Sequence, residues 1–217
     1  MRPFFVIVLL LKELNAVAQF NNTVSGFGSS SIDNPAYVNV SGNPYIPLTF
    51  QKAVCLKNTG AVDTLMVRLD TNEGVLEILK NNKIYLSKNT YKQFQVEIED
   101  EGRVVLRSGF KAVEGQNEQT FYQVRYDGKT KLLKLTRSKI DDCYEYNDVY
   151  KKCFKKFEFF YIQNIDGQLS RIDKDRELIW DLFGTKKDSL MAFSDKNKLR
   201  LKKWGDVCKI LEYYDSL

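Results

Sequence analysis

The residues that could do chemistry in this 217-residue sequence are carboxylates and thiols, because the chain contains no histidine. The absence of histidine excludes Ser-His and Cys-His catalysis, the HExxH zinc proteases and any histidine-ligated metal centre. The four cysteines form no C-x-x-C pair, and no Walker loop is present. Acid–base catalysis by carboxylates is the enzymatic option that remains.

Glu97, Glu99 and Glu101 alternate along a stretch that reads as a strand. With a rise of roughly 3.4 Å per residue, neighbouring members lie about 6.8 Å apart on one face. Inverting glycosidases separate their carboxyl groups by roughly 6.5 to 9.5 Å. A catalytic acid needs a pocket that raises its pKa, however, and a glutamate row that ends in a turn is typical of a solvated edge. A carboxylate-based glycan hydrolase therefore remains only an alternative function.

A second acidic group could supply oxygen ligands to calcium, which takes about six to eight of them. Its members are Asp141, Asp142, Glu145 and Asp148. They lack the alternation of glycine and acids that an EF-hand loop requires. We therefore expect no metal site and no cofactor.

The run "KKCFKKFEFFYI" resembles the aromatic and basic surface of a single-strand nucleic-acid binder. Strand alternation places Phe157, Phe159 and Tyr161 on one face, and Lys156, Glu158, Phe160 and Ile162 on the other. The aromatic side chains then read as core, and Glu158 interrupts the basic face. This interpretation predicts a core strand and no nucleic-acid partner.

The N-terminus has the features of a secretory signal peptide. In "MRPFFVIVLLLKELNAVAQF", Arg2 precedes an apolar run, and the small residues Ala16 and Ala18 suit a signal peptidase. The apolar run is too short to span a bilayer, which needs roughly 20 residues. We predict cleavage after Ala18 and an exported protein, periplasmic or secreted, with no lipid-anchoring cysteine and no transmembrane segment in the mature chain.

Export changes the expectation for the cysteines, because thiols outside the cytosol tend to pair. Cys143 and Cys153 flank a turn-prone "EYND" segment and are the pair that the spacing favours. Cys55 and Cys208 would then be joined or remain as buried thiols.

The chain divides into a signal peptide (1–18), a flexible leader rich in Ser, Asn and Gly (19–44), a β-meander (45–172) and a helical segment of the same domain (173–217). Turn residues at Asn58-Thr59-Gly60, Asn81-Asn82, Asp100-Glu101-Gly102, Asp127-Gly128 and Asp166-Gly167 predict five hairpins. The fold class is therefore α+β. An antiparallel meander of about ten strands, either a sheet or a partly closed barrel, is followed by two or three helices packed on it.

Side-chain periodicity assigns faces to these elements. Phe94, Val96 and Ile98 alternate with polar residues and predict a one-sided strand, whereas "FFYI" is apolar on both faces. A helical stripe, which stops at Gly184, begins the C-terminal segment, and a short helix is expected over Asp188 to Phe193. The last helix should bury one face, which carries Trp204, Val207, Cys208, Leu211 and Tyr214.

Three segments, "GNPYIPLTFQKAVCLKNTGAV", "FYQVRYDGKTKLLKL" and "DKNKLRLKKWGDVCKILEYYDSL", resemble a functionally uncharacterised family of exported proteins of Gram-negative bacteria. The resemblance covers Gly42 to Leu217. It implies a signal peptide, a hairpin-rich body and a C-terminal helix, and it carries over no catalytic residue. The segment "TNEGVLEILKNNKIYLS" and the Cys143 to Cys153 insert depart from the family pattern.

The sequence as a whole favours a non-enzymatic secreted or periplasmic module that binds an envelope or extracellular partner. A basic C-terminal region, with 14 basic against 8 acidic residues from Lys151 to Lys203, is one surface for it. The main alternative is a carrier of a lipid or other apolar molecule inside a barrel-like meander. The sequence specifies neither the ligand nor the oligomeric state.

Overall fold

The computed structural model describes residues 29–30, 37–87, 89–145, 149–172 and 176–217. The predicted signal peptide lies outside these residues. The strands are β1 (Ser29–Ser30), β2 (Val40–Ser41), β3 (Tyr45–Lys57), β4 (Val62–Asp70), β5 (Val75–Lys80), β6 (Lys83–Ser87), β7 (Tyr91–Ile98), β8 (Gly102–Arg107), β9 (Tyr122–Asp127), β10 (Lys131–Glu145), β11 (Val149–Gln163) and β12 (Leu169–Arg171). The helices are the 3₁₀ helix η2 (Arg176–Lys186), α1 (Lys187–Lys196) and α2 (Trp204–Ser216).

All the strands belong to one sheet with the order β1-β6-β5-β4-β3-β7-β8-β9-β10-β11-β12. Strands β3 to β6 form one meander and β7 to β12 form a second, and the two are joined where β3 pairs with β7. The predicted α+β class is confirmed. The sheet is mixed rather than purely antiparallel, because β2 pairs in parallel with β11. It is also open, since the outer strands β1 and β12 do not pair with each other.

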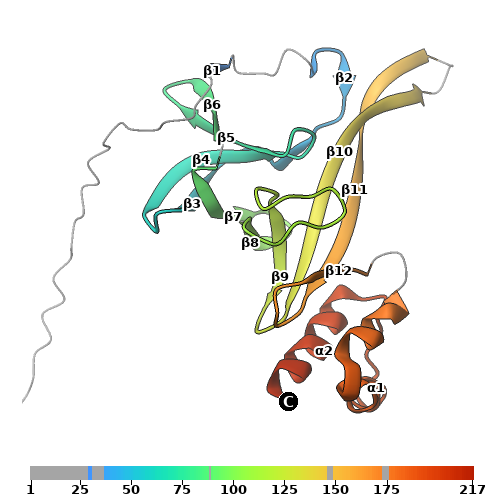
Figure 1. Ribbon diagram of the computed structural model, residues 1–217. Helices are drawn as coiled ribbons and strands as arrows, with labels where there is room; N and C mark the ends of the chain where they lie inside the picture. Colours follow the sequence, from blue (N-terminus) through green and yellow to red (C-terminus); the bar gives the residue numbers. More distant parts are fainter. Residues whose placement is uncertain (1–28, 31–36, 88, 146–148, 173–175) are drawn as a thin grey trace, which may run out of the picture.

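The five predicted hairpins are all present, and four of their turns contain residues with positive φ. Asn81 and Asn82 both have positive φ between β5 and β6, as do Gly60, Gly102 and Gly167 in their turns. Two further hairpins join β4 to β5 and β10 to β11. The second of these is the longest in the molecule and forms a ribbon that runs the length of the structure (Figure 1).

The first meander and strands β7 and β8 enclose a core on one face of the sheet. Phe94 and Val96 are buried there with Cys55 and Val67, and Ile98 packs against them, which confirms the predicted one-sided strand. Residues 37–44, which the sequence assigns to the leader, also lie against the sheet. The Tyr37 ring meets Phe154 edge to face at 4.9 Å.

The β10–β11 ribbon is buried on both faces at its lower end, as the "FFYI" pattern predicts. Phe160 and Ile162 pack against the helices on one face. On the other face Tyr161 packs with Tyr122 and with Phe110 from the 108–121 loop. The ribbon therefore lies between the helical layer on one face and this loop on the other (Figure 1).

The two meanders also meet through a buried polar contact. Thr71 follows β4, and its hydroxyl lies 2.7 Å from the Ser138 hydroxyl of β10. The Ser138 backbone N–H donates to the Thr71 carbonyl at 3.1 Å. Thr71 in turn donates its own N–H to the Pro44 carbonyl at 3.0 Å. Three segments that are distant in the sequence are thereby held together.

The predicted helical stripe lies in the 3₁₀ helix η2, which continues to Lys186 past a break at Gly184, where φ is 51° and ψ is −124°. The predicted short helix lies inside α1. The predicted buried face of the last helix is confirmed, because Val207 and Leu211 are buried and Trp204 stacks on Phe160 at 3.6 Å between ring centroids.

One buried side chain makes a clear prediction for stability. The Tyr122 residue is 1 % exposed, and its hydroxyl makes no hydrogen bond in the described structure. Tyr122→Phe removes this unsatisfied group and keeps the ring contacts, so the free energy of unfolding should rise by about 1 kcal/mol in urea titrations. Tyr91→Phe is the matched control, because the Tyr91 hydroxyl donates to Asp63 at 2.7 Å. That control should lose about 1 kcal/mol, and a loss in both variants would contradict the prediction.

Candidate binding groove

The glutamates on which the alternative hydrolase would depend are solvated, as the sequence indicates. Glu97 and Glu99 are exposed near the end of the β7–β8 hairpin, and Glu97 pairs loosely with Arg103 at 3.5 Å. Glu101 accepts hydrogen bonds from Gln123 at 2.9 Å and from Arg125 at 3.4 Å. None of the three lines the groove between α1 and α2 that is described below.

The acids that were considered for calcium point apart. Asp141 and Asp142 are consecutive strand residues on opposite faces of the ribbon, and they pair with Lys155 and Lys152 respectively. Asp148 and the side chain of Glu145 lie outside the described residues. Within the described part of the chain, no group of three or more Cys, Asp or Glu side chains is arranged to hold a metal ion.

All four cysteines lie in the described residues and are free thiols, so the predicted bridge between Cys143 and Cys153 is not present in the structure. The ribbon register explains this, because Cys143 lies opposite Lys151 and Cys153 opposite Asp141. The two cysteines are therefore diagonal neighbours, whose Cβ atoms are typically much further apart than the roughly 3.8 Å of a disulfide. Cys55 and Cys208 are not joined either. Burial raises the pKa of the Cys55 thiol to about 12.

The "KKCFKKFEFFYI" run lies in β11, and most of its aromatic residues are core as predicted. Phe157 is the exception, because its side chain is 44 % exposed. Its neighbour across the ribbon is Arg137, which is not an apolar residue. Phe159, two residues further along the strand, is partly buried in the core on this face.

One catalytic spacing that the sequence interpretation missed is Ser108-Gly109-Phe110-Lys111, which has the S-x-x-K form. The structure separates its two reactive groups. The Ser108 hydroxyl donates to the Lys92 carbonyl at 3.3 Å, whereas the Lys111 ammonium donates to the Asp166 carbonyl at 2.8 Å. The segment is a loop and not a helix, so the pair does not form a Ser–Lys dyad.

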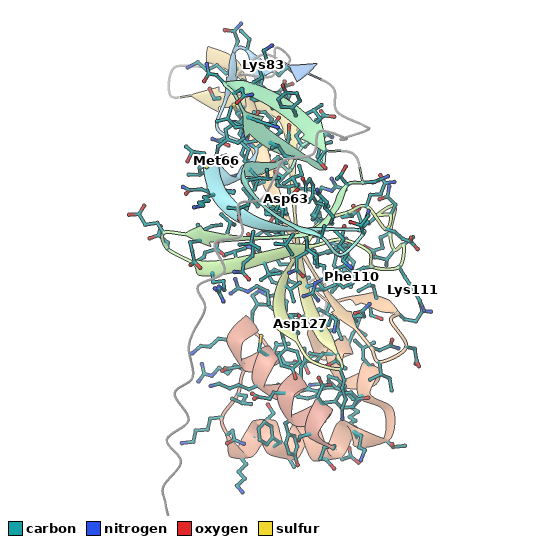
Figure 2. All side chains as sticks on the ribbon, turned by 90° about the vertical axis from the view of Figure 1, so that its left-hand side faces the viewer. Asp63, Met66, Lys83, Phe110, Lys111 and Asp127 are labelled. Atoms are coloured by element: carbon teal, nitrogen blue, oxygen red, sulfur yellow. The ribbon has the colours of Figure 1, made fainter. Side chains whose placement is uncertain are left out.

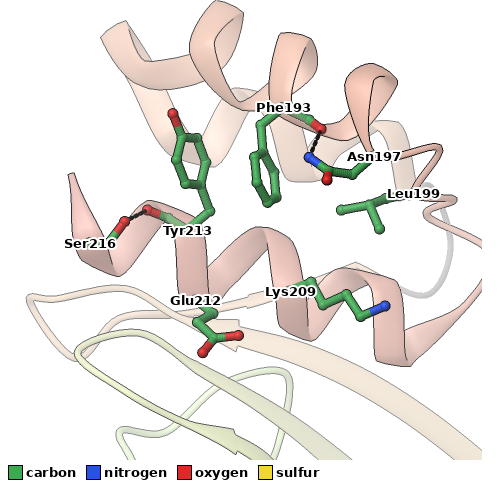
Figure 3. A pocket seen from close by; sticks show the side chains of 7 residues that line it. All are labelled: Phe193, Asn197, Leu199, Lys209, Glu212, Tyr213 and Ser216. Atoms are coloured by element: carbon green, nitrogen blue, oxygen red, sulfur yellow. Dashed lines mark hydrogen bonds between the residues drawn. The ribbon is translucent and has the colours of Figure 1, made fainter.

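A groove with the character of a binding site lies between α1 and α2 (Figure 3). It has a volume of about 540 Å³ and is open to solvent. This is within the range of roughly 300 to 1,000 Å³ that ligand sites occupy. The groove is lined by Phe193, Asn197, Leu199, Lys209, Glu212, Tyr213 and Ser216.

Helical spacing explains why these side chains converge. Lys209, Glu212, Tyr213 and Ser216 recur every three or four residues and so share one face of α2. The Phe193 ring of α1 stacks on the Tyr213 ring with centroids 4.0 Å apart and planes 13° apart. This aromatic pair forms the apolar part of the groove, while Lys209 and Glu212 bring one charge of each sign.

The loop between the two helices closes one end of the groove. Asn197 donates its side-chain amide to the Phe193 carbonyl at 2.8 Å, and the Leu199 N–H donates to the Ser194 carbonyl at 2.9 Å. The Arg200 N–H donates to the Asp206 carboxylate at 3.0 Å. These bonds hold the loop in a fixed conformation against the end of α1 and the start of α2.

We call the exposed cations of this connection the basic loop, and its members are Lys196, Lys198, Arg200, Lys202 and Lys203. The intervening Leu199 and Leu201 pack against the helical core, so the cations between them project outward. Among the described residues, none of the five makes an ion pair. The groove therefore ends at an unneutralised positive surface.

The opposite end of α2 is fixed to the sheet through Asp215. Its carboxylate accepts hydrogen bonds from the Tyr126 hydroxyl at 2.9 Å and from the Thr130 hydroxyl at 2.8 Å, and it also accepts the Thr130 N–H. Burial and this carboxylate raise the pKa of Tyr126 to about 12. Gly128 is required in the same turn, because a Cβ there would overlap the Asp215 carboxylate. The β9–β10 turn therefore holds the helix that carries most of the groove.

Lys203 makes a prediction for stability because it occupies the N-cap of α2 without a side-chain hydrogen bond to the helix. Lys203→Ser supplies the acceptor that this position favours and removes a cation from the positive end of the helix dipole. The free energy of unfolding should rise by about 1 kcal/mol, measured as a shift of the urea midpoint. Lys196→Ser, at the end of α1, is the control and should not stabilise the protein, because a cation is favourable there.

Comparisons with protein-family models, with curated proteins and with solved structures found no match for this chain. The described helices include none with the length and apolar character of a membrane span. The sequence interpretation predicted both helices of the groove but missed the groove itself. The available signal was the position of two aromatic residues, Phe193 and Tyr213, beside the buried stripes of the two helices, where both side chains are half-buried.

Proposed function

We propose that the protein is an exported, non-enzymatic binding module and that its partner docks in the groove between α1 and α2. The observation that carries this proposal is the groove itself. A half-buried aromatic pair lines the space between two helices, polar groups surround it, and α2 is fixed to the sheet through Asp215. Binding sites commonly combine an apolar surface with a few placed polar groups in this way.

The arrangement of the reactive side chains supports a role without catalysis. The glutamates on β7 are solvated, and Ser108 and Lys111 point to different partners. The carboxylate hydrolase consequently has little support. The apolar-ligand carrier also has less support than the binding module, because the sheet is open and the face with the first core is filled by packed side chains.

Site-specific photo-crosslinking in the producing cells tests the proposal without knowledge of the partner. A photoreactive phenylalanine analogue is placed at Lys209 or Glu212, which are exposed and line the groove. The matched control positions are Lys83 and Met66, on strands of the first meander far from the helices (Figure 2). We expect light-dependent adducts from the groove positions only. Adducts from the control positions alone, or none from the groove, would refute the proposal.

Export is tested on the same cells. Intact mass of the protein recovered outside the cytoplasm should correspond to a chain that begins at Gln19. Full-length protein that remains in the cytoplasm would contradict export while leaving the groove proposal to the crosslinking result.

A further inference from the structure

No acidic side chain of the described structure forms an ion pair with a cation of the basic loop. Its five cations are exposed and make no ion pair among the described residues. Asp206, at the start of α2, accepts the Arg200 N–H and lies 3.9 Å from Lys209. Asp195, at the end of α1, is a second acid beside the loop. The groove lining adds no net charge, because Lys209 and Glu212 offset each other. Five cations therefore stand beside two acids, and an anionic group at this end of the groove would meet a net positive charge.

The helix dipoles explain only part of this loop. Lys196 and Lys198 lie at the C-terminal end of α1, where cations are favourable. Lys202 and Lys203 lie at the N-terminal end of α2, where the dipole and the orphan N–H groups favour an acceptor or an anion instead. The placement of these two lysines opposes local stability. A role in binding explains their presence, whereas a role in the fold does not.

We infer that the groove receives an acidic segment of a protein partner, with an aromatic or large aliphatic side chain against Phe193 and Tyr213 and carboxylates against the basic loop. This inference rests on the proposed function. Arg200 presents the planar donor fork that binds carboxylates in two parallel hydrogen bonds. Glu212, on α2, disfavours further acids on its side of the anchor. The acidic residues of the segment therefore lie on one side of its anchor.

The geometry favours a peptide over an anionic membrane or a nucleic acid. The apolar surface is recessed between two helices, where a peptide side chain reaches it and a flat bilayer does not. A single groove with one aromatic stack also differs from the series of stacking side chains along which single-stranded nucleic acid binds. These two ligand classes are therefore outcomes that the test must separate.

The test measures fluorescence anisotropy of two short labelled peptides that share a Phe-Leu anchor. One carries glutamates on one side of the anchor and the other carries lysines. We expect the glutamate peptide to bind, to weaken as salt is raised, and to bind at least about tenfold less tightly to Lys198→Glu/Arg200→Glu. The control Lys52→Glu/Lys92→Glu has the same change in net charge on exposed positions of β3 and β7. It should change affinity by no more than about twofold.

A second readout separates binding from folding. Lys203→Ser should weaken the glutamate peptide while it stabilises the protein, which a purely structural role of this lysine would not produce. Phosphatidylglycerol vesicles and a thymidine oligonucleotide are titrated in parallel.

The inference is overturned if the lysine peptide binds as tightly, if the charge reversal has no effect, or if only vesicles or the oligonucleotide bind. In those cases adducts at Lys209 and Glu212 would still uphold the proposed function. If there is neither peptide binding nor a groove adduct, the inference and the proposed function are both refuted.

Discussion

Replacing Glu77 with glutamine should lower the free energy of unfolding by about 3 to 5 kcal/mol. Glu77 of β5 accepts a hydrogen bond from the Arg68 Nε of β4 at 2.7 Å, and the two side chains are only 5 % and 9 % exposed. The Arg68 guanidinium lies over the rings of Tyr45 and Phe50, at 3.5 and 4.2 Å from their centroids. Loss of the carboxylate leaves this cation buried without a counter-charge. Urea titration at neutral pH measures the effect.

The control for this prediction replaces both members of the pair. Arg68 Nη2 makes no hydrogen bond in the described structure, so the native pair is incompletely satisfied. Arg68→Met/Glu77→Leu removes both charges and keeps similar volume, and we expect its stability to match or exceed that of the wild type. A double variant as unstable as Glu77→Gln would show that packing, and not the unpaired charge, determines the loss.

Replacing Asp215 with alanine should cost about 2 kcal/mol and should selectively loosen α2. The substitution removes the acceptor for the Tyr126 hydroxyl and for two donors of Thr130. Because these donors are part-buried, water replaces only some of the lost hydrogen bonds. Hydrogen exchange should accelerate in α2 more than in β3 to β8. The groove peptide should bind more weakly as well, because Tyr213 and Ser216 lie on the same helix.

Asp195→Ala is the matched control for Asp215, because Asp195 is an exposed acid of α1 whose carboxylate makes no bond in the described structure. It should change stability by less than about 0.5 kcal/mol. Uniform acceleration of exchange across the sheet in Asp215→Ala would contradict the local role of this carboxylate.

The local features of the fold were predictable because they depend on neighbouring residues. Asn81-Asn82 and Asp166-Gly167 specify tight turns through their backbone preferences, and the alternation around Phe94 specifies a buried face. The β10–β11 hairpin was missed, because the segment between Cys143 and Cys153 suggested a disulfide loop. Its register puts the two thiols on a diagonal, a property that depends on strand pairing and not on spacing in the sequence.

The long-range features were not predictable from one sequence. The pairing of β3 with β7, and the contact between Thr71 and Ser138, join segments whose separation the local pattern does not encode. The groove has the same origin, because it depends on how α1 and α2 pack on each other. Its charge was visible in advance, since the alternation of cations with Leu199 and Leu201 is a property of the sequence itself.

The position of β3 between the two meanders has a consequence for synthesis of the chain. Strands β4 to β6 follow β3 directly and can pair as soon as they emerge, whereas the other side of β3 waits for β7. Until then, Ala53 to Lys57 presents unpaired backbone groups, a form of exposure that promotes association between nascent chains. This edge exists only while the chain is incomplete, because β7 covers it in the finished fold.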